Sequence, residues 1–178
     1  LKVEQLALNF VRYMSGIASN VAKFNLELAN LDTELLYSGH AVPGLEDFAA
    51  MAFLHGGGIL HEENKNYCVF TSNTIARFES IDDAIKAVKE IDKSIKPIVE
   101  VNDQAEFEEA LFSNASVIRL NTSKEQVIKN CSIINNDKKI LELQSEIELK
   151  RLRLTAKLGY KYIIIPSLSD AAKSLPVD

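Results

Sequence analysis

The sequence predicts an α/β fold whose parallel strands close, wholly or in part, into a βα barrel. Three observations predict it: short apolar runs recur along the second half, a helix-start signal follows each run, and the runs begin 19, 23 and 22 residues apart. The runs are Ile98-Val99, Val117-Ile118, Ile140-Leu141 and residues 162–165. With the strands expected earlier, this makes six or seven, enough for a barrel. A doubly wound sheet is the second choice, because no glycine-rich phosphate loop is present.

Composition limits the class of protein. The chain has 178 residues, of which 47% are hydrophobic and 25% charged, as expected for one globular domain with an apolar core. Its net charge of −5 argues against a general nucleic-acid binder, and no apolar stretch approaches the roughly 20 residues of a membrane helix. Two cysteines, Cys68 and Cys131, make no disulfide framework. We therefore expect a cytoplasmic protein without nucleic-acid or membrane partners.

The first half reads as two helices around one short strand. Apolar residues at steps of three and four, from Leu6 to Val21, predict one long amphipathic helix, or two abutting ones, over residues 3 to about 28. Residues 35–37 form a short strand, and Pro43-Gly44 opens the next helix. The glycine triplet 56–58 ends that helix as a turn, with a phosphate nest as the less favoured alternative. The expected apolar face of this second helix is Leu45, Phe48, Ala49, Ala52 and Phe53.

Helix starts in the second half are marked by polar pairs three residues apart. In each pair the first side chain is a candidate N-cap, and three pairs add the Glu or Gln of a capping box. The pairs are Ser80 with Asp83, Asp103 with Glu106, Ser123 with Gln126 and Ser145 with Glu148. Gly159 closes the last of these helices, expected over residues 146–158. The pattern supports one helix after each strand.

Functional side chains of βα barrels gather at the carboxyl ends of the strands. The residues expected there are Ser38 to His40, His61, Thr71 to Thr74, Glu100, Asn121, Gln144 with Ser145, and Pro166 with Ser167. Arg119 and Asn121 are two apart on one strand and so face the same side. We expect Arg119 to point inward between Glu100 and Glu142 of the flanking strands. Such a cluster neutralises buried charge, or, as the less favoured alternative, is the remnant of a ligand site.

Several motifs resemble the quinolinate phosphoribosyltransferase (nicotinate-nucleotide pyrophosphorylase) family. They are Leu8-Asn9-Phe10 leading to Ser15-Gly16-Ile17-Ala18, Pro43-Gly44, the glycine triplet with His61 three residues on, Ile98-Val99-Glu100-Val101, and residues 159–168. The resemblance is collinear over essentially the whole chain. The segment 69–78 is similar to the ModD-type relatives found with molybdate transport.

The resemblance implies a fold and a reaction. The family fold is an α/β barrel of about this length, preceded by an α/β domain that covers the partner's site in a dimer. That preceding domain is absent here, so residues 1–178 are expected to form a single barrel domain. The family transfers a phosphoribosyl group from phosphoribosyl pyrophosphate (PRPP) to the nitrogen of a pyridine carboxylate, with Mg²⁺ and loss of pyrophosphate. The resemblance thus implies an anionic small-molecule substrate, a role in NAD biosynthesis, and a homodimer or higher homo-oligomer.

The resemblance also implies roles for individual residues. Glu100 and Asn121 would be catalytic, holding the ribose hydroxyls or Mg²⁺, with Glu100 as the metal ligand. His40 and His61 would meet the carboxylate of the acceptor. The remaining substrate-site residues are Arg119, Glu142, Ser145 and Ser167.

Several positions depart from the family pattern. The family's Thr-Arg-Lys is Ser38-Gly39-His40 here, and its Asn-His-Arg is Leu60-His61-Glu62. Asn121 stands for its aspartate, 144–146 (Gln-Ser-Glu) for its Ser-Gly-Gly, and 166–168 (Pro-Ser-Leu) for its Gly-Ala-Leu. Losing cations and gaining carboxylates removes charge-assisted phosphate contacts, so PRPP should bind weakly or not at all. Two functions stay open: a divergent transferase, or an inactive family member with a binding or assembly role.

Overall fold

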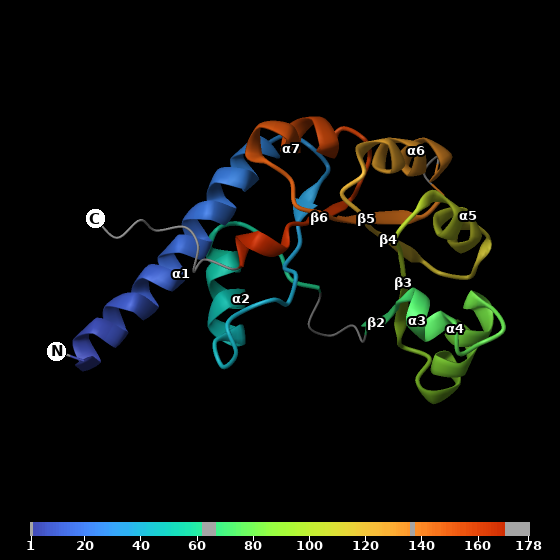
Figure 1. The fold of residues 1–178 in the computed structure, drawn as a ribbon, viewed down its shortest axis with the longest axis horizontal. Coiled ribbons are helices and arrows are strands. Elements are labelled where there is room, and N and C mark those ends of the chain that lie inside the picture. The colour runs from blue at the N-terminus through green and yellow to red at the C-terminus, as the bar shows by residue number, and fades with distance from the viewer. Residues whose placement is uncertain (1, 62–66, 136–137, 170–178) are drawn as a thin grey trace.

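The computed structural model describes residues 2–61, 67–135 and 138–169. Six parallel strands form one sheet in the order β1-β6-β5-β4-β3-β2. The strands are β1 (Glu34–Leu35), β2 (Tyr67–Phe70), β3 (Lys96–Val101), β4 (Val117–Asn121), β5 (Ile140–Gln144) and β6 (Tyr162–Ile164). Helices line the outer side of the curved sheet (Figure 1). The predicted α/β class with repeated βα units is confirmed.

The helices alternate with the strands from β2 onward. They are α1 (Lys2–Glu27), α2 (Glu46–His55), α3 (Ser72–Ile75), α4 (Ile81–Ile91), α5 (Gln104–Phe112), α6 (Glu125–Asn135) and α7 (Leu149–Ala156), with a short 3₁₀ turn η1 (Pro166–Leu168). None of the helices in the described part of the chain is long and apolar enough to span a membrane.

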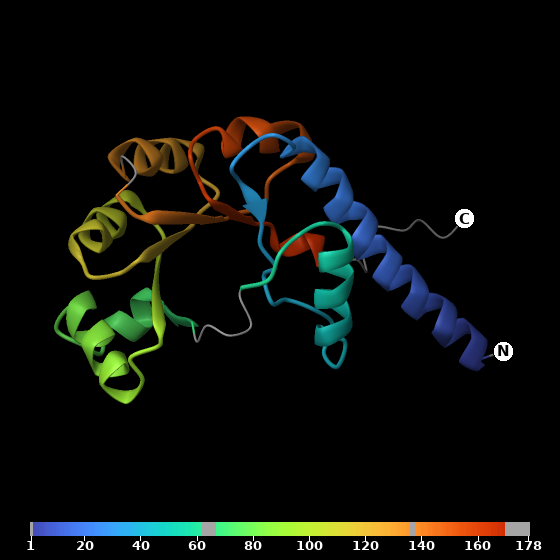
Figure 2. The ribbon, with the colours of Figure 1, turned by 180° about the vertical axis from the view of Figure 1, so that it is seen from behind.

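The barrel is partly open. In place of a further strand before His61, the structure has one isolated parallel bridge, between Leu36 and Ile59. In the described ranges no strand pairing joins Ile59 to β2. The sheet therefore has two edges, one at this bridge beside β1 and the other at β2. Seen from behind, the strands curve with the helices outside and the opening on the side of α2 and β2 (Figure 2).

Two of the four predicted N-caps are confirmed and two are wrong. The side chains of Ser80 and Asp103 accept hydrogen bonds from the backbone N–H of Asp83 (3.1 Å) and of Glu106 (3.0 Å). However, α6 begins only at Glu125 and α7 at Leu149. At Ser145 the backbone N–H donates to the Ile164 carbonyl (3.0 Å), so it cannot form the reciprocal bond of a capping box. The chain therefore continues the sheet where the capping pattern predicted a helix.

Side chains alternate between two environments along each strand. Outward residues such as Val99, Ile118 and Leu143 are buried against the helices and form the core of the protein. Inward residues on β3, β4 and β5 include Glu100, Arg119 and Glu142, which are register neighbours across the three strands. This period of two places the polar side chains inside the barrel.

The glycine triplet forms a turn that brings α2 tightly against α1. A Cβ placed on Gly56 would lie 2.5 Å from Val21 Cβ and 2.7 Å from the Ala18 carbonyl oxygen, and Gly57 has a φ of +87°. The predicted turn at these glycines is confirmed, and it also brings the end of α2 into close contact with α1. Phe48, expected on the buried face of α2, is instead 45% exposed, with its ring edge against Phe10 (5.1 Å between centroids).

Substituting Gly56 by alanine should destabilise the fold. Its φ of −76° suits alanine, so the cost comes from overlap with α1 alone, about 1–3 kcal/mol of unfolding free energy. Urea unfolding of Gly56→Ala and the wild type measures this difference. A loss below about 0.5 kcal/mol would show that the two helices separate freely at this point.

Candidate functional site

The carboxyl ends of the strands carry a polar pair on neighbouring strands. Glu100 lies near the end of β3 and Asn121 ends β4, and the Asn121 amide nitrogen donates to Glu100 Oε1 (3.4 Å). Both side chains are partly exposed toward the barrel mouth. No donor among the described residues bonds to the amide oxygen of Asn121, so the pair presents one carboxylate and one carbonyl oxygen to a ligand.

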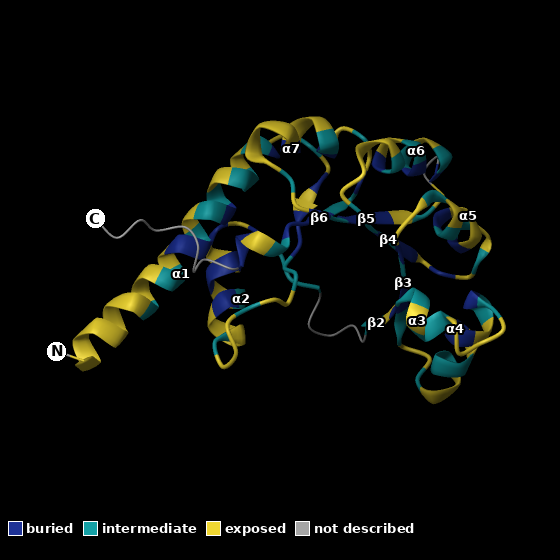
Figure 3. Ribbon diagram, in the orientation of Figure 1, coloured by how far each residue is buried: buried dark blue, intermediate teal, exposed yellow. Residues whose placement is uncertain are grey.

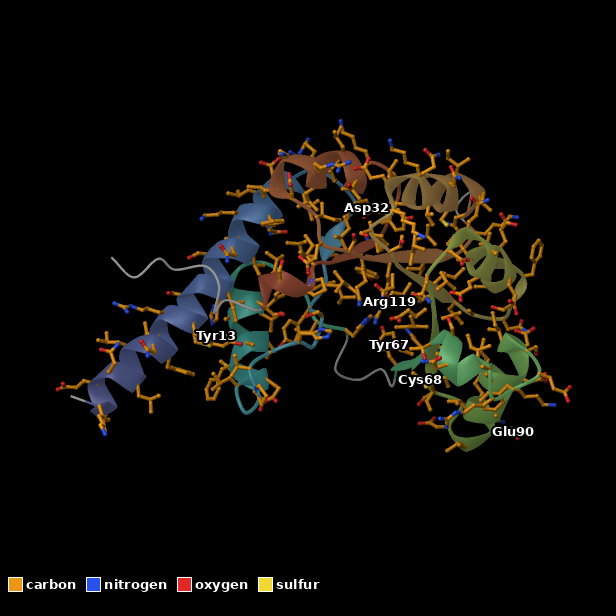
Figure 4. The ribbon with its side chains drawn as sticks, in the orientation of Figure 1. Tyr13, Asp32, Tyr67, Cys68, Glu90 and Arg119 are labelled. Atoms are coloured by element: carbon orange, nitrogen blue, oxygen red, sulfur yellow. The ribbon has the colours of Figure 1, made fainter. Side chains whose placement is uncertain are left out.

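One layer deeper, an ion cluster fills the middle of the barrel. Arg119 Nε donates to Glu142 Oε2 (2.7 Å), and an Arg119 terminal nitrogen lies 3.1 Å from His61 Nε2. Arg119 is 12% and Glu142 1% exposed. Figure 4 shows Arg119 pointing into the space that the strands enclose. The expected inward position of Arg119 beside Glu142 is confirmed, whereas Glu100 bonds to Asn121.

His61 and Tyr67 complete this interior. The two rings stack at a tilt, with centroids 4.4 Å apart, and His61 Nε2 is 3.7 Å from Glu142 Oε1. The sequence singled out His61 as a strand-end residue, and Tyr67 was missed. Tyr67 could have been found from its position two residues before Val69 on a short apolar run. Side chains two apart on a strand share a face, so the run predicts that Tyr67 and Val69 point to the same side of the sheet.

Burial and the neighbouring guanidinium make His61 a neutral imidazole. Desolvation, followed by the Arg119 charge, lowers the pKa of His61 to about 4. Since the arginine can only donate, His61 Nε2 must accept, and the ring proton resides on Nδ1. For Glu142, burial raises the pKa, and the attraction of Arg119 opposes this rise.

We expect His61 to titrate near pH 4 in the folded protein. The unfolded chain protonates this histidine near pH 6.5, so its stabilising contribution is present above pH 6.5 and is lost as the pH falls toward 4. The pH dependence of its ring signals in NMR measures the midpoint. Arg119→Met removes one of the two causes and should raise the pKa. A midpoint near 6.5 in the wild type would contradict the buried position of His61.

On the side of β1, β5 and β6 the mouth is a broad cavity of about 720 Å³, and Glu100 borders a smaller one of about 220 Å³ near β3. The lining of the larger cavity is formed by residues 40–43, Glu146, Pro166 and Ser167, and includes no lysine or arginine among the described residues. Glu146 accepts two hydrogen bonds from Ser167, one from its backbone N–H (3.0 Å) and one from its hydroxyl (2.5 Å). A carboxylate of the protein thus occupies the donors that an anionic ligand would use here.

The donors at the mouth fit a magnesium ion that arrives with its substrate. Mg²⁺ is usually held by one or two carboxylates together with substrate phosphates and water. Glu100 with the amide oxygen of Asn121 offers that partial set. In the described ranges no group of three or more His, Cys, Asp or Glu side chains is placed to hold a metal. Glu100 and Asn121 would therefore hold the ion only jointly with a bound diphosphate.

The residues singled out in the sequence fall into three groups. Arg119, Glu142 and His61 form the interior cluster, and Glu100 and Asn121 form the rim above it. The third group lies around the mouth: His40 and Ser167 line the cavity, and Ser145 is 8% exposed beside β6. Glu62 lies outside the described residues.

Comparisons with known proteins agree with the fold. The sequence profile described as "Quinolinate phosphoribosyl transferase, C-terminal domain" matches residues 17–178. A probable nicotinate-nucleotide pyrophosphorylase [carboxylating] of Methanocaldococcus jannaschii is 27% identical over 185 residues, 98% of this chain and 65% of that protein. A protein of the same name from Archaeoglobus fulgidus is 28% identical over 131 residues, 72% of this chain and 50% of that protein.

Solved structures show the same architecture. The nicotinate-nucleotide pyrophosphorylase of Ehrlichia chaffeensis superposes with a TM-score of 0.85 at 27% identity, covering 94% of this chain and 61% of that one. NadC from Streptococcus pyogenes gives a TM-score of 0.78 at 26% identity, covering 93% and 59%. The chain therefore spans less than two thirds of the length of these relatives.

Proposed function

Because this chain belongs to the quinolinate phosphoribosyltransferase family, we propose that it provides the barrel site of a phosphoribosyltransferase with a divergent, cation-poor mouth. The substrates would be PRPP and a pyridine carboxylate, and residues 1–178 would form one barrel domain. The observation that carries the proposal is the pairing of Glu100 with Asn121 at the carboxyl ends of adjacent strands. Strand ends are where βα barrels place their chemistry.

Each side chain receives a role from its position. Glu100 and Asn121 would bind the ribose hydroxyls and, with the diphosphate, Mg²⁺, which when bound neutralises charge on the leaving pyrophosphate. His61 is held by Arg119, so its Nδ1–H can donate to the carboxylate of the acceptor, with His40 from the opposite rim. Arg119 and Glu142 fix the orientation of His61, and Ser145 and Ser167 border the phosphate side.

The electrostatics of the mouth predict weak binding of PRPP to this chain. The described residues of the lining include no lysine or arginine, and Glu146 faces the same space. Each charge-assisted contact contributes roughly 1.5–3 kcal/mol, so the absence of several is a large loss. We therefore propose that PRPP occupies this site only at high concentration.

Release of pyrophosphate from PRPP tests the proposal. With Mg²⁺ and pyridine-2,3-dicarboxylate we expect slow release that requires both substrates, and a drop of at least about a hundredfold in Glu100→Gln. The matched control is Glu108→Gln, an exposed glutamate on α5. No acceptor-dependent release by a folded protein at millimolar substrates, or equal rates in the two variants, would overturn the transferase function.

An assembly role is the second candidate function, and an exposed apolar helix face favours it. The first turns of α1 extend beyond the body of the protein (Figure 3). Val3, Leu6 and Val11 are 79%, 71% and 60% exposed. A groove of about 560 Å³ runs along this face, from Val3 to Tyr13 with Leu45, the residue before α2. Contiguous apolar surface of this kind marks protein–protein contact, so we propose a homodimer or higher homo-oligomer through α1.

The free thiols of Cys68 and Cys131 support a reducing, cytoplasmic compartment.

Light scattering coupled to size exclusion tests the assembly. Leu6→Glu should convert the oligomer to a monomer, because a charge in an apolar contact is costly. Leu26→Glu is the matched control, since Leu26 is equally exposed at 74% and is not part of the groove. A wild-type protein that stays monomeric at about 100 μM would contradict the assembly role.

A further inference from the structure

A second cavity lies inside the barrel at the opposite end from the mouth. Its volume is about 550 Å³, it opens to solvent beside Ile140, which is 47% exposed, and the first residue of each of the six strands lines it. These residues are Glu34, Tyr67, Lys96, Val117, Ile140 and Tyr162. Glu142 and His61 also border the cavity, so the interior ion cluster forms the layer between it and the mouth.

The size of this cavity is unusual for the interior of a barrel. Closed βα barrels fill their interior with successive layers of side chains. Here the middle layer is filled by Arg119 and its partners, but the layer below it is not closed by Val117 and Ile140. The volume falls within the roughly 300–1,000 Å³ typical of small-molecule sites.

The walls combine one cation with phenols and apolar side chains. Lys96 and Tyr67 are register neighbours on β3 and β2, so both face the cavity side by side. In the described part of the chain Lys96 has no ion pair. Tyr162 lies in register between Glu34 and Glu142 on the other wall. An ammonium and two phenolic hydroxyls are donors that suit a carboxylate.

Charge counting limits the ligand to a monoanion. The Glu142 carboxylate is neutralised by Arg119 at 2.7 Å, and Glu34 lies 3.9 Å from Lys161. Among the described residues of the lining, Lys96 is then the cation left to receive a ligand, and the nearby carboxylates of Glu34 and Glu142 disfavour a dianion. The remaining surface is aromatic at Tyr67, Tyr162 and the neutral His61, which suits a planar apolar body.

We infer that this cavity binds a small aromatic monocarboxylate, with its carboxylate on Lys96 and its ring between Tyr67 and Tyr162. The site is separate from the strand-end site and does not depend on transferase activity. Its proposed contacts are Lys96, Tyr67 and Tyr162, whereas the strand-end site rests on Glu100 and Asn121. His61 and Glu142 lie between the two sites, so the experiments vary residues that belong to one site alone.

Calorimetric titration with benzoate tests the inference, with benzamide as the uncharged ligand of the same shape. We expect a benzoate Kd on the order of 1 mM and binding of benzamide at least about tenfold weaker. Lys96→Met should weaken benzoate about tenfold or more. Its matched control, Lys93→Met, removes an exposed lysine three residues earlier and should leave affinity unchanged.

A second variant separates loss of the site from loss of charge. Val117→Phe adds volume inside the cavity and keeps Lys96, so it should also abolish benzoate binding, while Glu100→Gln at the mouth should not affect it. NMR shifts on titration should map to Tyr67, Lys96 and Tyr162. No binding at tenfold higher benzoate, equal binding by Lys96→Met, or shifts confined to Glu146 and Ser167 would overturn the inference.

Discussion

Replacement of Arg119 by methionine is expected to lower the free energy of unfolding by about 3–5 kcal/mol. The reason is the burial of its partner: Glu142 is 1% exposed and has Arg119 Nε at 2.7 Å. Without the guanidinium, the buried Glu142 carboxylate forms no ion pair with a lysine or arginine among the described residues, and it must either keep an unpaired charge or take up a proton. Either outcome costs far more than the packing lost from the arginine stem.

Two comparisons separate this charge effect from lost packing. The double variant Arg119→Met/Glu142→Leu removes both charges and should recover most of the stability, because apolar pairs of similar volume replace buried ion pairs well. Arg151→Met breaks the exposed pair with Glu125, whose partners are 51% and 50% exposed, and should cost about 0–1 kcal/mol. Urea unfolding measures all three. If the double variant is no more stable than Arg119→Met, the cluster matters through shape and not charge.

The strand alternation made much of this interior predictable from the sequence. Arg119 and Asn121 are two residues apart, and the register of three similar strands placed Glu100 and Glu142 beside them. The helix that begins after Ser80 was equally predictable, because a cap is a local interaction between residues three apart. Periodicity and capping act over a few residues, so a single sequence contains enough information to identify them.

Contacts between distant segments could not be predicted in this way. His61 meets Arg119 across 58 positions, and Glu146 meets Ser167 across 21. The capping pattern at Ser145 failed for a related reason, since its backbone N–H is already engaged by Ile164. Likewise, nothing local shows that the first residues of six strands leave a cavity between them. Each of these features depends on the curvature of the sheet, which the sequence pattern does not specify.

Substitution of Glu146 by alanine is expected to strengthen the binding of PRPP with Mg²⁺ at least about tenfold. In the native protein the Glu146 carboxylate accepts from the Ser167 backbone N–H at 3.0 Å and from its hydroxyl at 2.5 Å. A phosphate must displace this internal anion and also tolerate its charge at the mouth. Alanine frees both donors and removes one negative charge from a cavity whose described lining has no lysine or arginine.

Glu148→Ala provides the matched control for that variant. It removes the same charge two residues away, from a side chain that is 67% exposed and paired with Lys150, and it leaves Ser167 bonded to Glu146. Thermal stabilisation by PRPP–Mg²⁺ reports both affinities through the shift that a ligand of the native state produces. A larger shift in Glu146→Ala alone identifies the occupied donors as the cause of weak binding. Equal shifts in the two variants would instead mean that PRPP responds to the overall negative charge of this face, and no change in either would place its phosphates elsewhere.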